Sequence, residues 1–394
     1  MKTIHIVGVG MGAPTTQAEK IVASCEVLIG ARGSLDVFER LGKPAFEGYK
    51  PEDVHRIIRQ ERAETFAVLV SGDVGFFSGA RRLVSELAQY DVRLTAGVPS
   101  VCAFFARLGL PWQDAALISA HGCLDRAPLV SAVRRNHLTF CLTGGNAPEI
   151  GAILARAGFG ELSVHVGENL GCPDERVFRV KASALQETQP MAVLLIVNEH
   201  FDASIPTGIP DSAFMRAEGV PMTKSEVRAV ILSKLRLRPH DICYDIGAGT
   251  GSVTVEMALS AHQGQVFAIE RQSAAVALTE ENCRKFHVGN VTPILGSAPS
   301  ALADLPAPDA VFIGGSGGRL PEIADALLQK NRNVRLVMAA IAIESVYDAL
   351  TQLERAGLSN IEAVQVSVSR AEKRAGMHLL LAQNPIFIIS GGGL

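Results

Sequence analysis

The sequence predicts an α/β protein made of two domains. Short apolar runs that are typical of strands alternate with helical patterns along the whole chain, as in sheets covered by helices. The length of 394 residues exceeds that of an ordinary single domain. Each half also contains an apolar run that leads into a glycine-rich turn, at 8–12 and at 245–251. We therefore expect a first domain at 1–200, a linker at 201–212 and a second domain at 213–394.

The first half predicts alternating strands and helices from its apolar periodicity. The expected strands are 4–7, 27–29, 66–70, 92–95, 117–119, 138–142, 163–166 and 192–197. The expected helices are 15–24, 51–62, 79–89, 101–108 and 147–157. The segment that follows contains Pro206, Gly208 and Pro210 and has no apolar period, which is typical of a linker.

The second half predicts a helix at 223–235, stopped by Pro239, and then repeated strand–helix units. The expected strands are 242–245, 265–269, 291–295, 310–313 and 334–338. The expected helices are one that ends at 260 and others at 273–287, 320–329 and 344–356. Two late strand-like segments, 362–369 and 378–389, suit an antiparallel pair added to a parallel sheet.

Composition places the chain among ordinary globular proteins, with 48% apolar and 20% charged residues. The net charge of −3 offers no general basic surface to nucleic acid. The seven cysteines form no C-x-x-C pair, so we expect neither a disulfide framework nor a protein metal site. No apolar run reaches the roughly 20 residues of a membrane span. We expect a cytoplasmic protein without nucleic-acid or membrane partners.

The second glycine turn, 245–251, reads D-I-G-A-G-T-G and joins an apolar run to a helical pattern. A strand, a glycine turn and a helix commonly cradle a nucleotide-like ligand. The spacing here is G-x-G-x-G, whereas dinucleotide-binding turns read G-x-G-x-x-G. Asp245 also disfavours a pyrophosphate, because both groups are negative. A ligand with a cationic centre and no phosphate, such as S-adenosylmethionine, fits this turn better.

Further candidates stand where the next strands end. Glu270 ends the second strand, and an acid there can accept both hydroxyls of a ribose; the alternative is a solvated strand-end carboxylate. The third strand ends at Gly296, Ser297 and Ala298, where the edge of an adenine would lie. The fourth ends in 314–319, which reads G-G-S-G-G-R and lets a large flat substrate approach the backbone. The alternative for this last segment is a flexible loop.

Several motifs of the second half occur together in one known family. They are P-M-T-K-S-E-V-R at 221–228, D-I-G-A-G-T-G-S-V-T at 245–254, Glu270, G-S-A-P-S-A-L at 296–302 and I-G-G-S-G-G at 313–318. In this order they resemble the decarboxylating precorrin methyltransferase domain of cobalamin biosynthesis, which has the Rossmann-like class I methyltransferase fold. The turn and the resemblance together imply an S-adenosylmethionine pocket at Thr223, Asp245, Gly247, Ala248, Gly249, Thr250, Gly251, Glu270, Ser297 and Ala298. Ser297 stands where related domains often carry Asp.

The first half carries motifs of a second family. The segment 71–77 reads S-G-D-V-G-F-F and resembles a loop of the tetrapyrrole methylase family, the class III methyltransferases; Val74 replaces a frequent proline of that loop. Further matches lie at 97–101, 120–122 and 167–175. In this two-lobed fold the methyl donor sits between the lobes, so the resemblance implies a first S-adenosylmethionine site. Its residues, or those of its rim, would be Gly72, Asp73, Val74, Ser100 and His121. For His121, a hydrogen-bonded loop residue is an equal alternative.

Together the two resemblances cover almost the whole chain. Their order implies a bifunctional S-adenosylmethionine-dependent C-methyltransferase with two donor sites per chain. Such an enzyme methylates carbons 5 and 15 of a precorrin and decarboxylates the ring C acetate to give precorrin-8. Family analogy also implies a homo-oligomer. No catalytic side chain is assigned, because the donor methyl is already electrophilic and the enzyme mainly has to align it with the acceptor carbon.

The many carboxylates of a precorrin should meet Arg and Lys side chains. We expect these contacts on the helix at 223–235, after the glycine run, and in the loop before the last strand. The candidate substrate residues are Lys224, Arg228, Gly315, Ser316, Gly317, Arg319, Arg370, Lys373 and Arg374. The alternative is that these cations are simply solvated.

Other functions share these folds. An RNA or other small-molecule methyltransferase is the first alternative. A nucleic-acid enzyme should show a broad basic face and stacking aromatic residues, whereas this chain has one tryptophan, Trp112, and four tyrosines. A nicotinamide-dependent oxidoreductase is the second alternative, which the glycine spacing disfavours. In a third, the first half is only a scaffold for the second.

Overall fold

A computed structural model describes residues 1–121, 124–374 and 376–393 of the chain. Gly122 of the 120–122 motif and Cys123 lie outside these ranges. The chain forms two compact units. The first comprises Met1–Leu124, Leu138–Ile150 and Leu162–Val197, and the second comprises Asp125–His137, Gly151–Glu161 and Asn198–Leu394.

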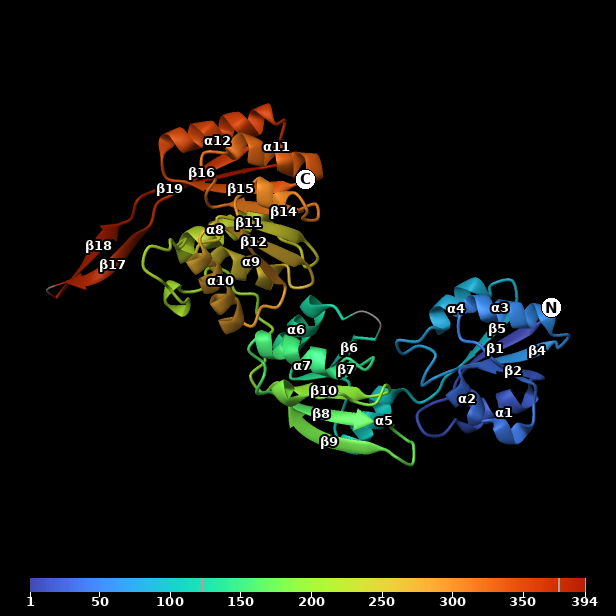
Figure 1. Cartoon of the computed structure of the whole chain (residues 1–394). Helices are drawn as coiled ribbons and strands as arrows, with labels where there is room; N and C mark the ends of the chain where they lie inside the picture. The colour runs from blue at the N-terminus through green and yellow to red at the C-terminus, as the bar shows by residue number, and fades with distance from the viewer. Residues whose placement is uncertain (122–123, 375, 394) are drawn as a thin grey trace. The chain divides into compact units, whose positions relative to one another are not determined.

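The first lobe of the first unit is a parallel sheet with the strand order β3-β2-β4-β1-β5. Its strands are β1 (Thr3–Gly8), β2 (Val27–Gly30), β3 (Ala45–Glu47), β4 (Thr65–Val70) and β5 (Asp91–Thr95). The helical segments are α1 (Thr16–Ser24), α2 (Arg32–Asp36), η1 (Glu39–Leu41), α3 (Pro51–Gln60) and α4 (Ala80–Glu86). Side chains of α3 and α4 share a core with one face of this sheet, and those of α1 share a core with the other (Figure 1).

The second lobe is a mixed sheet with the order β6-β7-β10-β8-β9. Its strands are β6 (Ala116–Ser119), β7 (Leu138–Leu142), β8 (Ser163–Glu168), β9 (Arg176–Lys181) and β10 (Val193–Val197). The helical segments in this stretch of chain are α5 (Ser100–Leu108), α6 (Arg126–Arg135), α7 (Ala147–Arg156) and η2 (Ala182–Ala184). Phe104 and Phe105 of α5 pack against Phe140 of β7. The predicted two-lobed α/β architecture is confirmed; α6 and residues 151–156 of α7 lie in the second unit.

The second unit is built on a seven-stranded sheet with the order β13-β12-β11-β14-β15-β19-β16. Its strands are β11 (Ile242–Ile246), β12 (Gln265–Glu270), β13 (Val291–Leu295), β14 (Ala310–Ile313), β15 (Arg335–Ala340), β16 (Glu362–Val366) and β19 (Ile386–Gly391). The first five strands in this order are parallel, and β19 is antiparallel to both β15 and β16. The chain runs outward in both directions from β11 and β14, so a topological switch point lies between these two strands.

Helices cover both faces of this seven-stranded sheet. They are α8 (Ser225–Leu235), α9 (Ser252–Ser260), α10 (Ser273–Lys285), α11 (Leu320–Lys330) and α12 (Ile343–Arg355), with short turns η3 (Asp211–Ala213) and η4 (Ser300–Leu302). Strand residues alternate between two cores, so Cys243 packs with α8, α9 and α10, and Tyr244 packs with α11 and α12. The Rossmann-like prediction for this half is confirmed.

A separate hairpin departs from the end of the sheet. Its strands are β17 (Ser369–Arg374) and β18 (Met377–Ala382), which pair only with each other (Figure 1). The predicted antiparallel pair added to the sheet is formed by β16 and β19, which cover only part of the predicted segments 362–369 and 378–389. Each segment splits into two strands, and β18 and β19 are separated by Pro385, which has no N–H to donate to a strand ladder.

The cysteines in the described ranges are free thiols. Cys25, Cys141, Cys243 and Cys283 are buried and free, whereas Cys172 is exposed. In the ranges that the structure describes, no helix is long and apolar enough to span a membrane. The same ranges contain no group of three or more His, Cys, Asp or Glu arranged to hold a metal ion.

Candidate functional site

The glycine turn of the second unit connects β11 to α9 through three glycines in the left-handed region. Gly247, Gly249 and Gly251 have φ values of 81°, 55° and 73°, which residues with a Cβ rarely adopt. Space requires glycine as well. A Cβ on Gly249 would lie 2.7 Å from the carbonyl oxygen of Pro221, and one on Gly251 would lie 2.8 Å from Thr279. Neighbouring atoms therefore pack tightly against the backbone of the turn, as its G-x-G-x-G spacing predicts.

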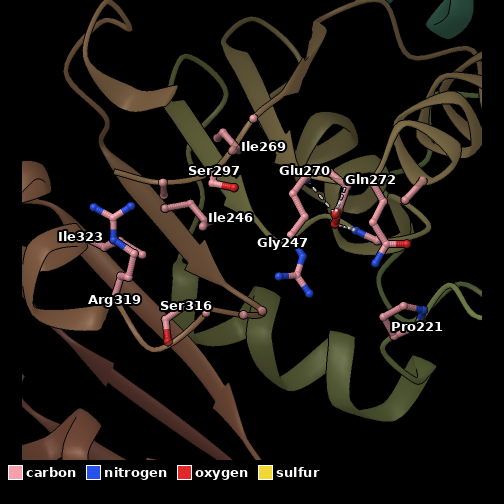
Figure 2. A pocket seen from close by; sticks show the side chains of 18 residues that line it. Pro221, Ile246, Gly247, Ile269, Glu270, Gln272, Ser297, Ser316, Arg319 and Ile323 are labelled. Carbon is pink, nitrogen blue, oxygen red and sulfur yellow. Dashed lines mark hydrogen bonds between the residues drawn. The ribbon is translucent and has the colours of Figure 1, made fainter. Parts of the chain in front are cut away.

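Glu270 at the end of β12 holds the turn in place. Its Oε2 accepts a hydrogen bond of 3.1 Å from the backbone N–H of Gly249. Its Oε1 accepts bonds of 2.7 and 3.0 Å from the N–H groups of Arg271 and Gln272 (Figure 2). Each carboxylate oxygen has more than one acceptor position, so Glu270 can fix the turn and still accept from ligand hydroxyls.

A cavity of about 420 Å³ opens where β11, β12 and β14 end; we call this edge of the sheet the carboxyl edge. The cavity is lined by Pro221, Ile246, Gly247, Gly249, Ile269, Glu270, Arg271, Gln272, Ala275, Gly296, Ser297, Ala298, Gly314, Gly315, Ser316, Gly317, Arg319 and Ile323 (Figure 2). The cavity lies at the switch point, where sheets of this class bind ligands. It brings together three groups of predicted residues: those of the turn, the ends of β12 and β13, and the glycine run.

Five predicted pocket residues do not line this cavity. They are Thr223, Asp245, Ala248, Thr250 and Gly251. Asp245 is wholly buried, and its Oδ2 accepts a bond of 2.5 Å from the hydroxyl of Thr254 in α9. Among the described residues, its Oδ1 has no hydrogen-bond partner. Burial raises the pKa of Asp245 to about 7. We correct the expectation of direct ligand contact: Asp245 supports the turn from inside the protein.

Arg228 is also not a substrate residue, because it is wholly buried. Its Nε donates to Glu256 at 2.7 Å, and Nη1 donates to Asp211 at 3.0 Å. The guanidinium also donates to the carbonyl oxygens of Thr223 and Ile209. These bonds tie α8 and α9 to the segment that precedes α8. The prediction of a substrate contact is wrong, since the charge is already paired in the core.

The predicted cations of the hairpin also lie away from the cavity lining. They stand on β17, not in a loop before the last strand. Arg370 donates to both oxygens of Glu226 at 2.9 and 2.8 Å, and Arg374 pairs with Glu372 at 3.1 Å. Lys224 lies 3.8 Å from Asp211. None of these cations lines the cavity.

Two arginines do line the cavity, Arg319 and Arg271. Within the described ranges, neither guanidinium has an ion pair or a hydrogen bond. Arg319 was predicted. Arg271 was missed, although the sequence held a signal, since it directly follows the strand-end Glu270 at the same edge of the sheet.

The first unit holds a second loop site around Asp73. Its Oδ1 accepts from the N–H of Gly75 at 2.8 Å, and its Oδ2 accepts from the N–H of Gly97 at 3.1 Å. A Cβ on Gly97 would lie 2.1 Å from the carbonyl oxygen of Gly72. The loops that follow β4 and β5 are therefore in close backbone contact, with the aspartate joining them.

A cavity of about 220 Å³ lies beside this loop. Its lining residues are Met11, Ser71, Gly72, Asp73, Phe76, Phe77, Ser78, Ser100, Ser119, His121, Leu142, Thr143, Pro190, Met191, Ala192 and Val193. Of the predicted residues, Gly72, Asp73, Ser100 and His121 are present. Val74 packs instead against the core of the first sheet. The lining includes residues from both lobes, and its role as a donor site stays a prediction.

Comparison with known proteins identifies the family. The description "Precorrin methyltransferase domain" matches residues 213–390, and "Tetrapyrrole (Corrin/Porphyrin) Methylases" matches residues 3–186. Over 185 residues the chain is 43% identical to the probable cobalt-precorrin-6B C(15)-methyltransferase (decarboxylating) of Pyrobaculum calidifontis; the match covers 94% of that protein and 46% of this chain. The chain belongs to the precorrin methyltransferase family.

Two more proteins of the family are similar to the chain. The cobalt-precorrin-6B C(15)-methyltransferase (decarboxylating) of Salmonella typhimurium is 41% identical over 181 residues, which cover 93% of it and 46% of this chain. The crystal structure of a precorrin-6Y C5,15-methyltransferase from Geobacter metallireducens is 38% identical, with 97% of that chain and 47% of this one covered and a TM-score of 0.45. The precorrin methyltransferase family uses S-adenosylmethionine as its methyl donor.

Proposed function

We propose that this chain is a bifunctional C-methyltransferase of cobalamin biosynthesis that methylates carbons 5 and 15 of a precorrin and decarboxylates the ring C acetate, giving precorrin-8. The observation that carries the proposal is the 43% identity with a decarboxylating C(15)-methyltransferase over nearly its whole length. The tetrapyrrole methylase match in the first half supports a second methylation by the same chain, which we assign to carbon 5. The second unit accordingly performs the carbon 15 methylation and the decarboxylation.

The residues of the second-unit cavity fit S-adenosylmethionine. Gly247 and Gly249 present bare backbone to the cavity, and a Cβ at Gly249 would not fit beside Pro221. Glu270 has acceptor positions for ribose hydroxyls, and Ile269 adds an apolar wall. The volume falls within the range of about 300–1,000 Å³ that is usual for small-molecule sites.

The chemistry requires alignment more than a reactive side chain. S-adenosylmethionine supplies a methyl group on a positively charged sulfur, which is electrophilic without further activation. The protein has to hold an electron-rich ring carbon in line with that methyl and to exclude water. Gly315, Ser316 and Gly317 leave room for a flat ring at the mouth of the cavity. Arg319 and Arg271 can pair with the carboxylates of the substrate.

Decarboxylation follows from the same binding mode. When the ring C acetate loses carbon dioxide, the electron pair of the broken C–C bond passes into the macrocycle, which accepts it once a ring nitrogen is protonated. A proton then replaces the lost carboxylate. The protein contributes by holding the acetate and by keeping the macrocycle in place.

The first-unit cavity is proposed as a second donor site. Two observations support this proposal: the close backbone contact between the Asp73 loop and the loop after β5, and the presence of Ser100 and His121 in the cavity lining. Titration of the full chain with S-adenosylhomocysteine in a calorimeter tests this part of the proposal. Two ligands per chain are expected. A stoichiometry of one would reduce the first unit to a scaffold.

We also propose that the protein is a cytoplasmic homo-oligomer in which the β17–β18 hairpin contacts another subunit. A lone two-stranded hairpin is only marginally stable in water. Met377, Leu379 and Leu380 on this hairpin are 63%, 44% and 74% exposed, which a subunit contact would cover. The molar mass in solution, measured by light scattering, should exceed that of one chain and should fall when Leu380 is replaced by Glu.

A further inference from the structure

Three large apolar side chains are exposed where β15 passes into α12. Ile341, Ile343 and Tyr347 are 65%, 75% and 69% exposed. Ile343 and Tyr347 are four residues apart on α12 and therefore lie on one face of the helix, and Ile341 lies two residues before the start of that helix. We call these three residues the α12 platform. A group of exposed apolar side chains of this size marks a binding surface more often than chance exposure.

The platform lies at the same carboxyl edge as the cavity. Strands β14 and β15 are parallel neighbours, with Ile313 opposite Met338. The segment after β14 is the glycine run that lines the cavity and ends at Arg319. The segment after β15 is the platform. Both segments therefore leave the sheet at its carboxyl edge, the platform two residues further along, since β15 continues from Met338 to Ala340.

A tetrapyrrole has chemical groups that this edge of the sheet can bind. It has two broad apolar faces and a rim of carboxylates. The glycine run has almost no side chains, so the macrocycle can approach the methyl donor across it. The platform can then cover part of an apolar face, while the unpaired Arg319 at the end of the run meets a carboxylate. Glu344 and Asp348 are also exposed on the first turns of α12, so the substrate carboxylates should lie toward Arg319 and away from these two acids.

We propose that Ile341, Ile343 and Tyr347 bind an apolar face of the macrocycle and set the orientation in which carbon 15 meets the methyl donor. This inference rests on the proposed function and adds residues that determine the binding of its substrate. A tetrapyrrole is favoured over a second copy of the chain because the platform continues the cavity edge and is bordered by the unpaired cation of Arg319. The hairpin already offers a separate surface for subunit contacts.

The test is the double variant Ile343→Ser/Tyr347→Ser of the full-length protein, assayed with the precorrin that the unmodified enzyme methylates. The KM for this substrate at carbon 15 should rise by at least about tenfold, since the contact area of two large apolar side chains is lost. The affinity for S-adenosylhomocysteine and the methylation at carbon 5 should not change. Tyr347→Phe should retain the normal KM, because the ring provides the contact.

Tyr49→Ser is the matched control, because Tyr49 is also 69% exposed and lines neither cavity; it should leave the KM unchanged. An unchanged KM in the double variant would overturn the inference. A fall in molar mass of the double variant would also overturn it, since the platform would then be a subunit contact. These outcomes differ from a failure of the proposed function, in which the unmodified enzyme itself would not methylate the precorrin.

Discussion

Replacement of Gly249 by Ala is expected to remove the donor site of the second unit and to spare that of the first. Gly249 has a φ of 55°, which costs a residue with a Cβ about 1–2 kcal/mol. The new Cβ would lie 2.7 Å from the carbonyl oxygen of Pro221, so the turn must shift. That shift breaks the bond from the Gly249 N–H to the Glu270 carboxylate, and a hydrogen bond to a charged group contributes about 1.5–3 kcal/mol.

These two contributions give a loss of about 2.5–5 kcal/mol, which corresponds to roughly 70- to 5,000-fold weaker donor binding. Calorimetry with S-adenosylhomocysteine should therefore detect one site per chain in Gly249→Ala instead of two. Methylation at carbon 15 should be lost, while methylation at carbon 5 should persist.

Gly219→Ala serves as the control for this experiment. Gly219 also has a positive φ, of 76°, but a Cβ there would meet no described atom within 4 Å. This variant carries the backbone strain without the clash, and it should keep both sites. If Gly249→Ala remained folded and still bound two ligands, or if it lost both activities, the assignment of one activity to each unit would be refuted.

Three more predictions concern buried and loop carboxylates. Asp73→Ala removes the acceptor for the N–H groups of Gly75 and Gly97, so methylation at carbon 5 should fall first, measured from the positions of labelled methyl groups in the product. Burial raises the pKa of Asp245 from 3.8 to about 7, so the folded state retains a proton that the unfolded state releases. Stability should therefore fall as the pH rises from about 4 to about 7, and Asp245→Asn should flatten this part of the profile of urea midpoint against pH. Arg228→Met leaves the carboxylate of Glu256 buried without its charged partner, which should cost about 3–5 kcal/mol. Thermal unfolding measures this cost, and a Tm within a degree of the original would contradict the assigned role.

The sequence predicts those parts of the site that depend on local spacing. The turn at 245–251 is identifiable because three left-handed positions need three glycines, and Glu270 because it ends the next apolar run. Both features are set within a few residues of chain. In the structure Gly247, Gly249 and Glu270 line one cavity together, and their contact with a methyl donor stays a prediction.

The sequence does not predict which charged side chains are buried, or which residues far away in the chain become their partners. Arg228 resembles a surface cation of an amphipathic helix until Glu256 and Asp211 are brought against it. Asp245 stands beside the ligand turn in the sequence, yet its side chain points into the core toward Thr254. In both cases the charge is matched by residues that only the folded chain brings near.

Some helices and strands are not predicted because their apolar patterns are weak. Strands β3 and β9 lie at the edges of their sheets, with largely exposed side chains, so they lack the apolar run by which most of the other strands are recognised. Helix α6 has a proline in its first turn and two arginines in its last, which weakens its apolar pattern. The α12 platform is not predicted either, because the sequence alone does not distinguish an exposed isoleucine from a buried one.

The product of the reaction tests the central assignment most directly. The full-length enzyme is incubated with a purified precorrin that lacks methyl groups at carbons 5 and 15, together with labelled S-adenosylmethionine, and the product mass is recorded. The account predicts a gain of two labelled methyl groups and the loss of one carbon dioxide. Recovery of the precorrin unchanged, while RNA or another small molecule acquires the label, would contradict it.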